Sequence, residues 1–189
     1  MILEGLVTTR KPDGAIHLAP MGPRMDSDGR RFLLRPFPTS STYQNLLLHG
    51  EGVLHVTDDV LLLAKAALGQ AEVPAWKIAS KVHGFVLKDA CRAMEFVVRS
   101  IDDSGERIQI RAEVVHAETL RDFWGFNRAK HAVIEAAIFC TRLHFLPLDE
   151  VSHEFAKLRV IVDKTGGSPE LEAFAFLEDH LHRTREQRR

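Results

Sequence analysis

The hydrophobic residues of this 189-residue chain change their spacing near residue 125. Before that point, short apolar or alternating runs are separated by Pro, Gly and Asp, which is the pattern of β-strands joined by turns. After it, apolar residues recur every three or four positions, which is the pattern of helices with one buried face. The spacing therefore predicts an α+β protein, mainly β, with one domain over residues 1–125 and a helical domain over residues 126–189.

The strand region predicts two hairpins. Residues 2–9 and 15–19 flank the turn Lys11–Gly14, in which Pro and Gly occupy favoured places. Residues 86–102 and 107–119 flank a polar turn, and in the second arm apolar and charged residues alternate as in a half-buried antiparallel strand. The remaining elements of this region are predicted strands over 31–37 and 52–57 and short helices over 39–48 and 60–68. About six strands broken by two short helices favour a closed or partly closed antiparallel barrel over a parallel sheet.

The helical region predicts one buried helix and one helical hairpin. Residues 127–143 are so apolar that this helix is expected to be buried, and residues 148–162 and 171–181 are expected to form an antiparallel pair. Glu135 interrupts the apolar helix, so we expect a buried carboxylate paired with a nearby basic residue.

Composition excludes several classes of function. The chain has 25 Lys and Arg against 26 Asp and Glu, so no global charge favours nucleic acid or an anionic membrane. No segment approaches the roughly 20 apolar residues of a membrane span, and residues 1–7 lack the features of a signal peptide. The two cysteines suggest a reducing compartment, so we expect a cytoplasmic protein. The histidine and cysteine spacings match no metal site.

A polar junction follows the third predicted strand. Arg35 ends that strand, and four consecutive hydroxyl residues, Thr39, Ser40, Ser41 and Thr42, stand at the start of the next helix. An arginine, hydroxyl groups and free helix N–H groups suit a phosphate monoester. An ordinary strand end with a Ser/Thr helix cap explains the same residues, and the sequence pattern leaves both interpretations open.

Several stretches resemble the FMN-binding split β-barrel (flavin reductase-like) superfamily. They are residues 2–9, the Asp13-Gly14 turn, Ala19-Pro20-Met21-Gly22, and the stretches 50–59 and 127–137. More narrowly, the chain resembles an uncharacterised branch of that superfamily with a helical C-terminal extension. His55 stands where that branch has an asparagine.

The resemblance implies a homodimer of split barrels with FMN at the subunit interface. Residues expected to line the flavin ring are Thr8, Thr9, Arg10, Ala19, Pro20 and Met21. Residues expected to hold the phosphate are Arg35, Thr39, Ser40, Ser41 and Thr42, with Tyr43 and Asn45 beside them. Asn127 and Arg128 are expected as further contacts.

Two functions of different classes follow from these expectations. One is a flavin-dependent oxidoreductase that passes hydride between a nicotinamide or deazaflavin donor and an acceptor, for which the chain needs no nucleophile motif of its own. The alternative is a non-catalytic dimeric module that holds FMN or another planar anion and docks a partner through its helical domain. A vacant barrel that serves only in assembly is a third interpretation. Arg10 stabilises an anionic reduced flavin in the first interpretation and is an exposed turn residue otherwise.

Overall fold

The computed structural model describes residues 1–188, which divide into two compact units. The first unit contains residues 1–57 and 72–123, and the second contains residues 58–71 and the chain from Trp124 onward. The first unit consists of β1 (Gly5–Arg10), β2 (Ile16–Met21), β3 (Arg24–Met25), β4 (Arg31–Leu34), α1 (Ser41–His49), β5 (Glu51–Val56), β6 (Trp76–Ile78), β7 (Phe85–Leu87), β8 (Arg92–Asp102) and β9 (Gln109–Thr119). The second consists of α2 (Val60–Ala67), α3 (Arg128–Cys140), α4 (Leu148–Thr165) and α5 (Ser168–Gln187).

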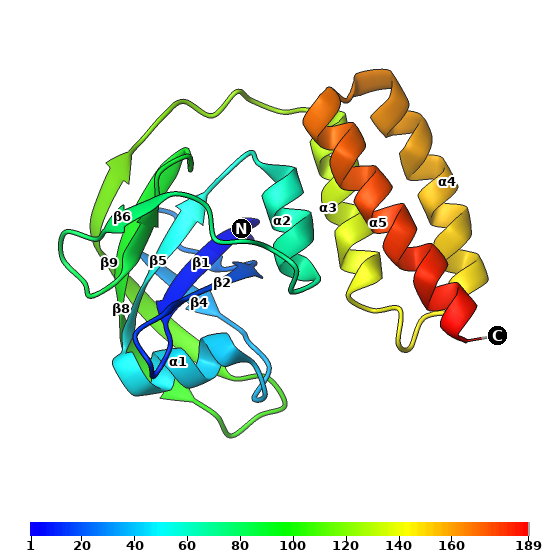
Figure 1. Ribbon diagram of the computed structural model, residues 1–189. Coiled ribbons are helices and arrows are strands. Elements are labelled where there is room, and N and C mark those ends of the chain that lie inside the picture. The colour runs from blue at the N-terminus through cyan, green and yellow to red at the C-terminus, as the bar shows by residue number, and fades with distance from the viewer. Residues whose placement is uncertain (189) are drawn as a thin grey trace. The chain divides into compact units, whose positions relative to one another are not determined.

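Seven strands of the first unit form one curled antiparallel sheet in the order β2-β1-β5-β8-β9-β4-β3 (Figure 1). The strand β1 therefore lies between its hairpin partner β2 and β5. Gly5 and Gly52 permit the close approach of β1 and β5, because a Cβ atom would lie 2.6 Å from the His55 carbonyl oxygen at Gly5 and 2.9 Å from the Thr8 carbonyl oxygen at Gly52. The predicted α+β class and partly closed antiparallel barrel are confirmed.

The concave side of the sheet holds the main core of this unit. The buried residues of that core come from five of the strands, from α1 and from the residue just before β9: Val7, Phe32, Leu34, Tyr43, Leu46, Leu54, Met94, Phe96, Ile108, Ile110 and Ala112. Tyr43 and Leu46 belong to α1, so this helix closes one side of the barrel. The predicted alternation along residues 108–112 is confirmed, because the even-numbered residues are buried and the odd-numbered ones are exposed.

A flap, residues 76–87, covers the other face of β1 and β5. It contains the two-stranded sheet β6–β7 and buries Val82 and Val86 against Val53 and Ala93. The single strand expected over residues 86–102 is wrong, because a turn at residues 88–91 separates β7 from β8 and directs β7 to β6. The charged pair Lys88 and Asp89 is exposed at this break.

Buried side chains accept hydrogen bonds from the backbone N–H groups of the flap. The Glu95 carboxylate of β8 is 1% exposed and accepts hydrogen bonds from the backbone N–H groups of Ser80, Lys81 and Val82, at 2.7, 2.5 and 3.2 Å. The His55 ring of β5 accepts from the Leu87 N–H through Nε2 at 3.0 Å. Because Nε2 accepts, the ring proton is on Nδ1, which lies 3.3 Å from the Leu6 carbonyl oxygen.

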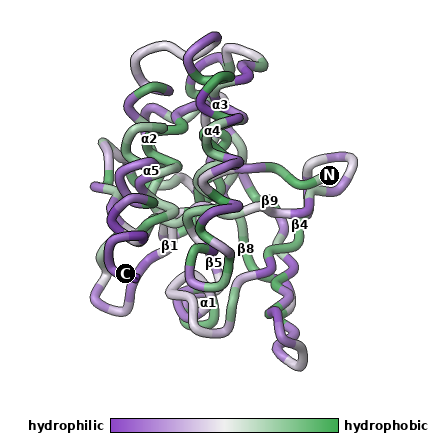
Figure 2. The backbone as a smooth tube through the Cα atoms, turned by 90° about the vertical axis from the view of Figure 1, so that its right-hand side faces the viewer, coloured by the Kyte–Doolittle hydropathy of each residue, from purple (hydrophilic) through white to green (hydrophobic). Residues whose placement is uncertain are grey.

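The second unit is a helical assembly in which α2, α3 and α5 contact one another and α4 contacts α3 and α5. The predicted buried helix is α3, and α4 and α5 form the predicted antiparallel pair (Figure 1). Along these helices the hydropathy alternates between hydrophilic and hydrophobic residues, as expected for helices with one buried face (Figure 2). Helix α2 packs in this unit although it lies within the residue range 1–125. None of the helices within residues 1–188 has the length and apolar character of a membrane span.

Glu135 is exposed on α3, so its predicted burial with a basic partner is wrong. The α3 stripe that packs in the core contains its neighbours Ala132, Val133 and Ala136, and Glu135 lies outside it. The buried carboxylate of this unit is Glu170, whose Oε1 lies 2.9 Å from Lys130 Nζ. Burial acts to raise the pKa of Glu170, but the hydrogen bonds from Lys130 and from the Gly167 N–H outweigh it and hold this pKa below its usual value.

We predict that His55 makes the barrel unit sensitive to acid. Burial lowers the pKa of His55 from 6.5 to about 4 in the folded protein, so between these values the unfolded chain binds a proton that the folded chain excludes. The free energy of unfolding should therefore rise with pH across this window, by about 3 kcal/mol for this residue.

Urea unfolding of the wild type and of His55→Asn at a series of pH values checks this expectation. The variant should lack this part of the pH dependence. Between pH 7 and 8, where the ring is neutral in both states, the stability difference between the two proteins should be constant. Equal slopes below pH 6.5 would contradict the assignment.

Candidate functional site

A ladder of polar side-chain pairs joins α1 to the β1–β2 hairpin. On α1, polar residues at positions i, i+3 and i+7 face the hairpin, as the helical repeat requires. Thr42 Oγ1 lies 3.3 Å from His17 Nε2, and Asn45 Nδ2 donates to Thr9 Oγ1 at 2.9 Å. We call the three pairs Thr42–His17, Asn45–Thr9 and His49–Arg10 the polar ladder. Thr9, Thr42 and Asn45 are buried, so this contact is more than a solvated surface.

The ladder ends at the pair of Arg10 and His49. Arg10 Nη2 lies 3.1 Å from His49 Nδ1. A guanidinium cannot accept a hydrogen bond, so His49 Nδ1 is the acceptor and its ring proton is on Nε2. Arg10 Nε and His49 Nε2 are both buried and have no hydrogen-bond partner among residues 1–188. Each buried donor without an acceptor costs about 1–3 kcal/mol, so two adjacent ones indicate a place for an acceptor group.

The other end of α1 carries the predicted phosphate residues. Ser40 is the N-cap, and its Oγ accepts from the Tyr43 N–H at 3.2 Å, so this hydroxyl is already engaged. Arg35, Thr39 and Ser41 are exposed in the approach to the helix and its first turn, whereas Thr42 is buried in the ladder pair with His17.

Sequence reasoning missed Arg107, which the β4–β9 pairing places beside this junction. Its guanidinium lies 3.3 Å from the centre of the Phe37 ring and donates to the Arg35 carbonyl oxygen at 3.4 Å. Two arginines therefore flank the chain that enters α1. The only sequence signal for Arg107 was its place on the polar face of a strand, which does not specify its neighbour.

The predicted ring-side residues divide between the two faces of the hairpin. Thr9, Ala19 and Met21 share the face that bears α1 and the concave core, since Thr9 bonds Asn45 and Met21 packs on that core. Thr8 lies on the opposite face, where its hydroxyl donates to the Phe85 carbonyl oxygen of the flap at 2.6 Å. Pro20 pairs with Leu6, so it lies on the same face of the hairpin as Thr8.

Tyr43 and Asn45 lie on the inner side of α1. The Tyr43 hydroxyl donates to Asp103 Oδ2 at 3.4 Å, and burial together with this carboxylate raises the pKa of Tyr43. The neighbouring ladder histidine, His17, has a lowered pKa because of burial and of Lys11. The sequence pattern gave no role to His49.

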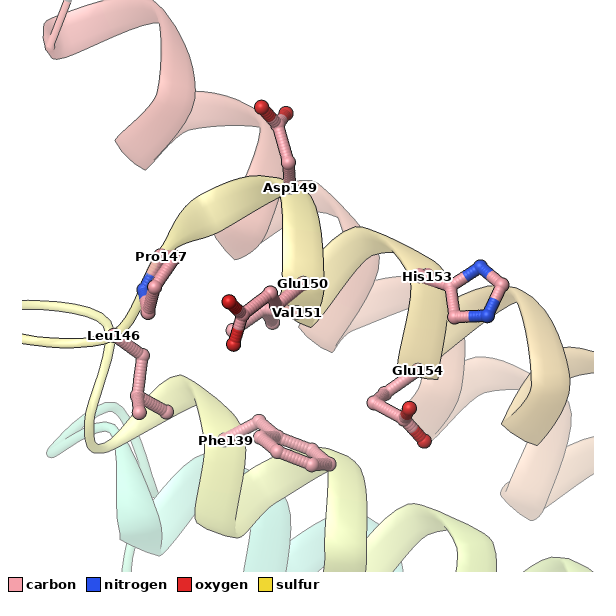
Figure 3. A pocket seen from close by; sticks show the side chains of 8 residues that line it. All are labelled: Phe139, Leu146, Pro147, Asp149, Glu150, Val151, His153 and Glu154. Atoms are coloured by element: carbon pink, nitrogen blue, oxygen red, sulfur yellow. The ribbon is translucent and has the colours of Figure 1, made fainter.

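Asn127 and Arg128 lie in the helical unit. Asn127 caps α3, because its Oδ1 accepts from the Lys130 N–H at 3.1 Å and its Nδ2 donates to the Thr165 carbonyl oxygen at 3.0 Å. Both residues line a pocket of about 320 Å³ between α3 and α4. A second pocket of about 470 Å³ lies between the end of α3 and the start of α4, where Glu150 points toward Phe139 and Asp149 points away (Figure 3).

We predict that Asn45 and Thr9, the central pair of the ladder, are energetically coupled. Asn45→Leu should destabilise the barrel unit by about 1–3 kcal/mol, because it leaves the buried Thr9 hydroxyl without its donor. Replacing both partners, in Asn45→Leu with Thr9→Val, should recover part of that loss because both groups become apolar without a change of shape. Thermal or urea unfolding measures the four corners of this cycle. Additive costs would show that the pair is not coupled.

Solved structures share this fold. An FMN-bound protein from Methanosarcina mazei aligns with a TM-score of 0.82 at 21% identity, covering 95% of this chain and 94% of its own. The 2-nitrobenzoate 2-nitroreductase of Pseudomonas fluorescens aligns with a TM-score of 0.53 at 18% identity, covering 61% of this chain and 64% of its own. Component B of the nitrilotriacetate monooxygenase of Bacillus cereus aligns with a TM-score of 0.53 at 17% identity, covering 63% of this chain and 70% of its own. The expected split barrel with a C-terminal helical part is confirmed.

No curated protein matches this sequence at a significant level. Two family models do match it. The model described as the N-terminal domain of a protein of unknown function (DUF447) matches residues 3–121, and a second DUF447 model matches residues 127–179. The chain therefore belongs to the DUF447 family.

Proposed function

We propose that this protein binds FMN in its barrel unit and acts as a flavin-dependent oxidoreductase. The observation that carries the proposal is the buried polar ladder along α1, which ends in two buried donors that have no acceptor among residues 1–188. The fold is shared with an FMN-bound member of the same family, and this likeness supports the choice of ligand.

The N-terminal end of α1 suits the phosphate of FMN. Arg35 and Arg107 supply positive charge, and the exposed hydroxyls of Thr39 and Ser41 supply donors. The first N–H groups of α1 and the positive end of its dipole favour an anion there. Ser40 and Thr42 contribute by fixing the helix start and its inner face, because their hydroxyls are engaged within the protein.

The C-terminal end of α1 suits the polar edge of the flavin ring. Ala19 and Met21 are partly buried on the hairpin face that bears α1 and would form one wall, and Arg10 extends from the end of β1. Thr9 is buried in its pair with Asn45 and would support this wall. Thr8 and Pro20, on the opposite face, would support this wall from behind. FMN supplies the redox chemistry when bound, and the protein orients it, excludes water and sets the nearby charge.

The resemblance that suggests FMN also suggests the assembly. We place the flavin at the interface of a homodimer in the cytoplasm, and the donor is a nicotinamide or deazaflavin that binds transiently beside it. The chain has no glycine-rich dinucleotide motif, which agrees with a donor that has no site of its own. Asn127 and Arg128, which belong to the helical unit, remain predicted contacts of FMN.

A second candidate function is a non-catalytic flavin-binding module that docks a partner through its helical unit. Two exposed aromatic side chains favour it, since Trp124 is 88% and Phe126 is 94% exposed at the start of that unit. The pocket of Figure 3 adds a partly apolar surface on the same unit.

Absorbance spectroscopy of the purified protein separates these possibilities. A yellow protein that releases FMN, and whose flavin is bleached by a reduced nicotinamide or deazaflavin without oxygen, supports the oxidoreductase. Bound flavin that every donor leaves oxidised supports the module. A colourless protein that fails to take up FMN would overturn both.

We predict that Arg35→Ala weakens FMN binding by about 1.5–3 kcal/mol, or roughly 10- to 150-fold, because it removes a charge-assisted hydrogen bond to the phosphate. Riboflavin, which lacks the phosphate, should bind the variant and the wild type equally. Fluorescence titration measures both affinities. Arg99→Ala is the matched control, because Arg99 is an exposed arginine of the same unit that pairs with Glu113. Equal FMN affinity of Arg35→Ala and the wild type would refute the phosphate assignment.

A further inference from the structure

The buried atoms that lack a hydrogen-bond partner converge at one end of the polar ladder. Within residues 1–188 there are three such side-chain atoms, and two of them, Arg10 Nε and His49 Nε2, belong to one contacting pair. The third is an oxygen of Glu118, whose other oxygen accepts from Lys77 at 2.9 Å. Two of the three buried polar atoms without a hydrogen-bond partner in the described chain therefore lie in the single pair of Arg10 and His49.

Both unmet atoms at this pair are donors. Arg10 Nε always carries a hydrogen, and His49 Nε2 carries one because Nδ1 accepts from Arg10. The other two rungs differ, because none of their side-chain atoms is both buried and without a partner in the described chain. The ladder is thus satisfied internally along two rungs and incomplete at the third.

The length of α1 separates this pair from the proposed phosphate site. The helix has nine residues, so its two ends lie about 13 Å apart. FMN carries acceptor-rich groups in two places, the phosphate and the carbonyl oxygens of the pyrimidine ring. The helix N-terminus favours the anionic phosphate, which leaves the pyrimidine carbonyls for the donors at the other end.

We propose that Arg10 and His49 form a subsite for the carbonyl edge of the flavin pyrimidine ring, in which His49 both orients the Arg10 guanidinium and donates a hydrogen bond to the ring. This inference rests on the proposed function. The His49 Nδ1 contact fixes one nitrogen of the guanidinium, and the remaining Arg10 Nε–H and His49 Nε2–H bind the acceptor atoms. The positive charge of Arg10 then favours the reduced flavin, which gains negative charge at this edge.

Two substitutions at one position test the role of His49. His49→Leu removes both the acceptor for Arg10 and the Nε2 donor. His49→Gln retains an acceptor and a donor in a side chain of similar length, so it serves as the conservative variant. His116→Leu is the control, because His116 is a partly buried histidine of the same unit on β9.

Four properties are measured for each protein: the affinities for FMN and for riboflavin, the reduction potential of the bound flavin, and the ¹⁵N-NMR signal of Arg10 Nε–H with and without riboflavin. His49→Leu should weaken both flavins about tenfold or more, because the subsite does not involve the phosphate. Its bound flavin should have a more negative potential. His49→Gln and His116→Leu should stay near the wild type, and riboflavin should slow the solvent exchange of the wild-type Arg10 Nε–H.

Wild-type riboflavin affinity and potential in His49→Leu would overturn the inference while leaving the proposed function intact. An Arg10 Nε–H signal that riboflavin does not change would also overturn it. A wild-type protein that binds neither flavin would instead refute the proposed function, and the subsite with it.

Discussion

The burial of β1 on both faces is the constraint on which the barrel unit depends. Four consecutive side chains of this strand, Leu6 to Thr9, are at most 1% exposed. Such a strand needs a cover on each face, and two of the buried side chains carry hydroxyls that need partners. The concave core and α1 cover one face and supply Asn45, and the flap covers the other and supplies the Phe85 carbonyl oxygen. The position of α1, and with it the candidate site, follows from this requirement.

The flap strands β6 and β7 form a sheet of their own, so side chains, rather than a continuous ladder of strand hydrogen bonds, hold the flap on the main sheet. A carboxylate accepts hydrogen bonds without donating any, so Glu95 can satisfy three successive N–H groups of a chain that turns over the sheet. His55 likewise accepts a hydrogen bond from a flap N–H group, that of Leu87, and only the neutral form of its ring can do so. His55 therefore has a structural role, because its ring joins β1 to the flap.

Local patterns predicted most of the fold, and contacts between distant segments account for the differences. The hairpins, α1 and the three C-terminal helices follow from hydrophobic spacing and turn residues, which act within a few positions. The flap is a tertiary arrangement, since residues 85–87 have an apolar run that suits a longer strand and only Lys88-Asp89 interrupts it. Arg107 and His49 were missed for the same reason. Their partners are 72 and 39 residues away, and no spacing within the sequence specifies such pairs.

The electrostatics of α1 explain why Arg10 Nε and His49 Nε2 can persist without acceptors among residues 1–188 of the folded protein. The last residue of the helix is His49, and the negative end of the helix dipole stabilises the guanidinium beside it. This attraction offsets part of the cost of the two unmet donors, about 1–3 kcal/mol each. A ligand that brings acceptor atoms removes the remaining cost when it binds. Affinity at this end of α1 should then depend on hydrogen-bond geometry, whereas affinity at the other end depends on charge, so one short helix can distinguish the two polar ends of a single ligand.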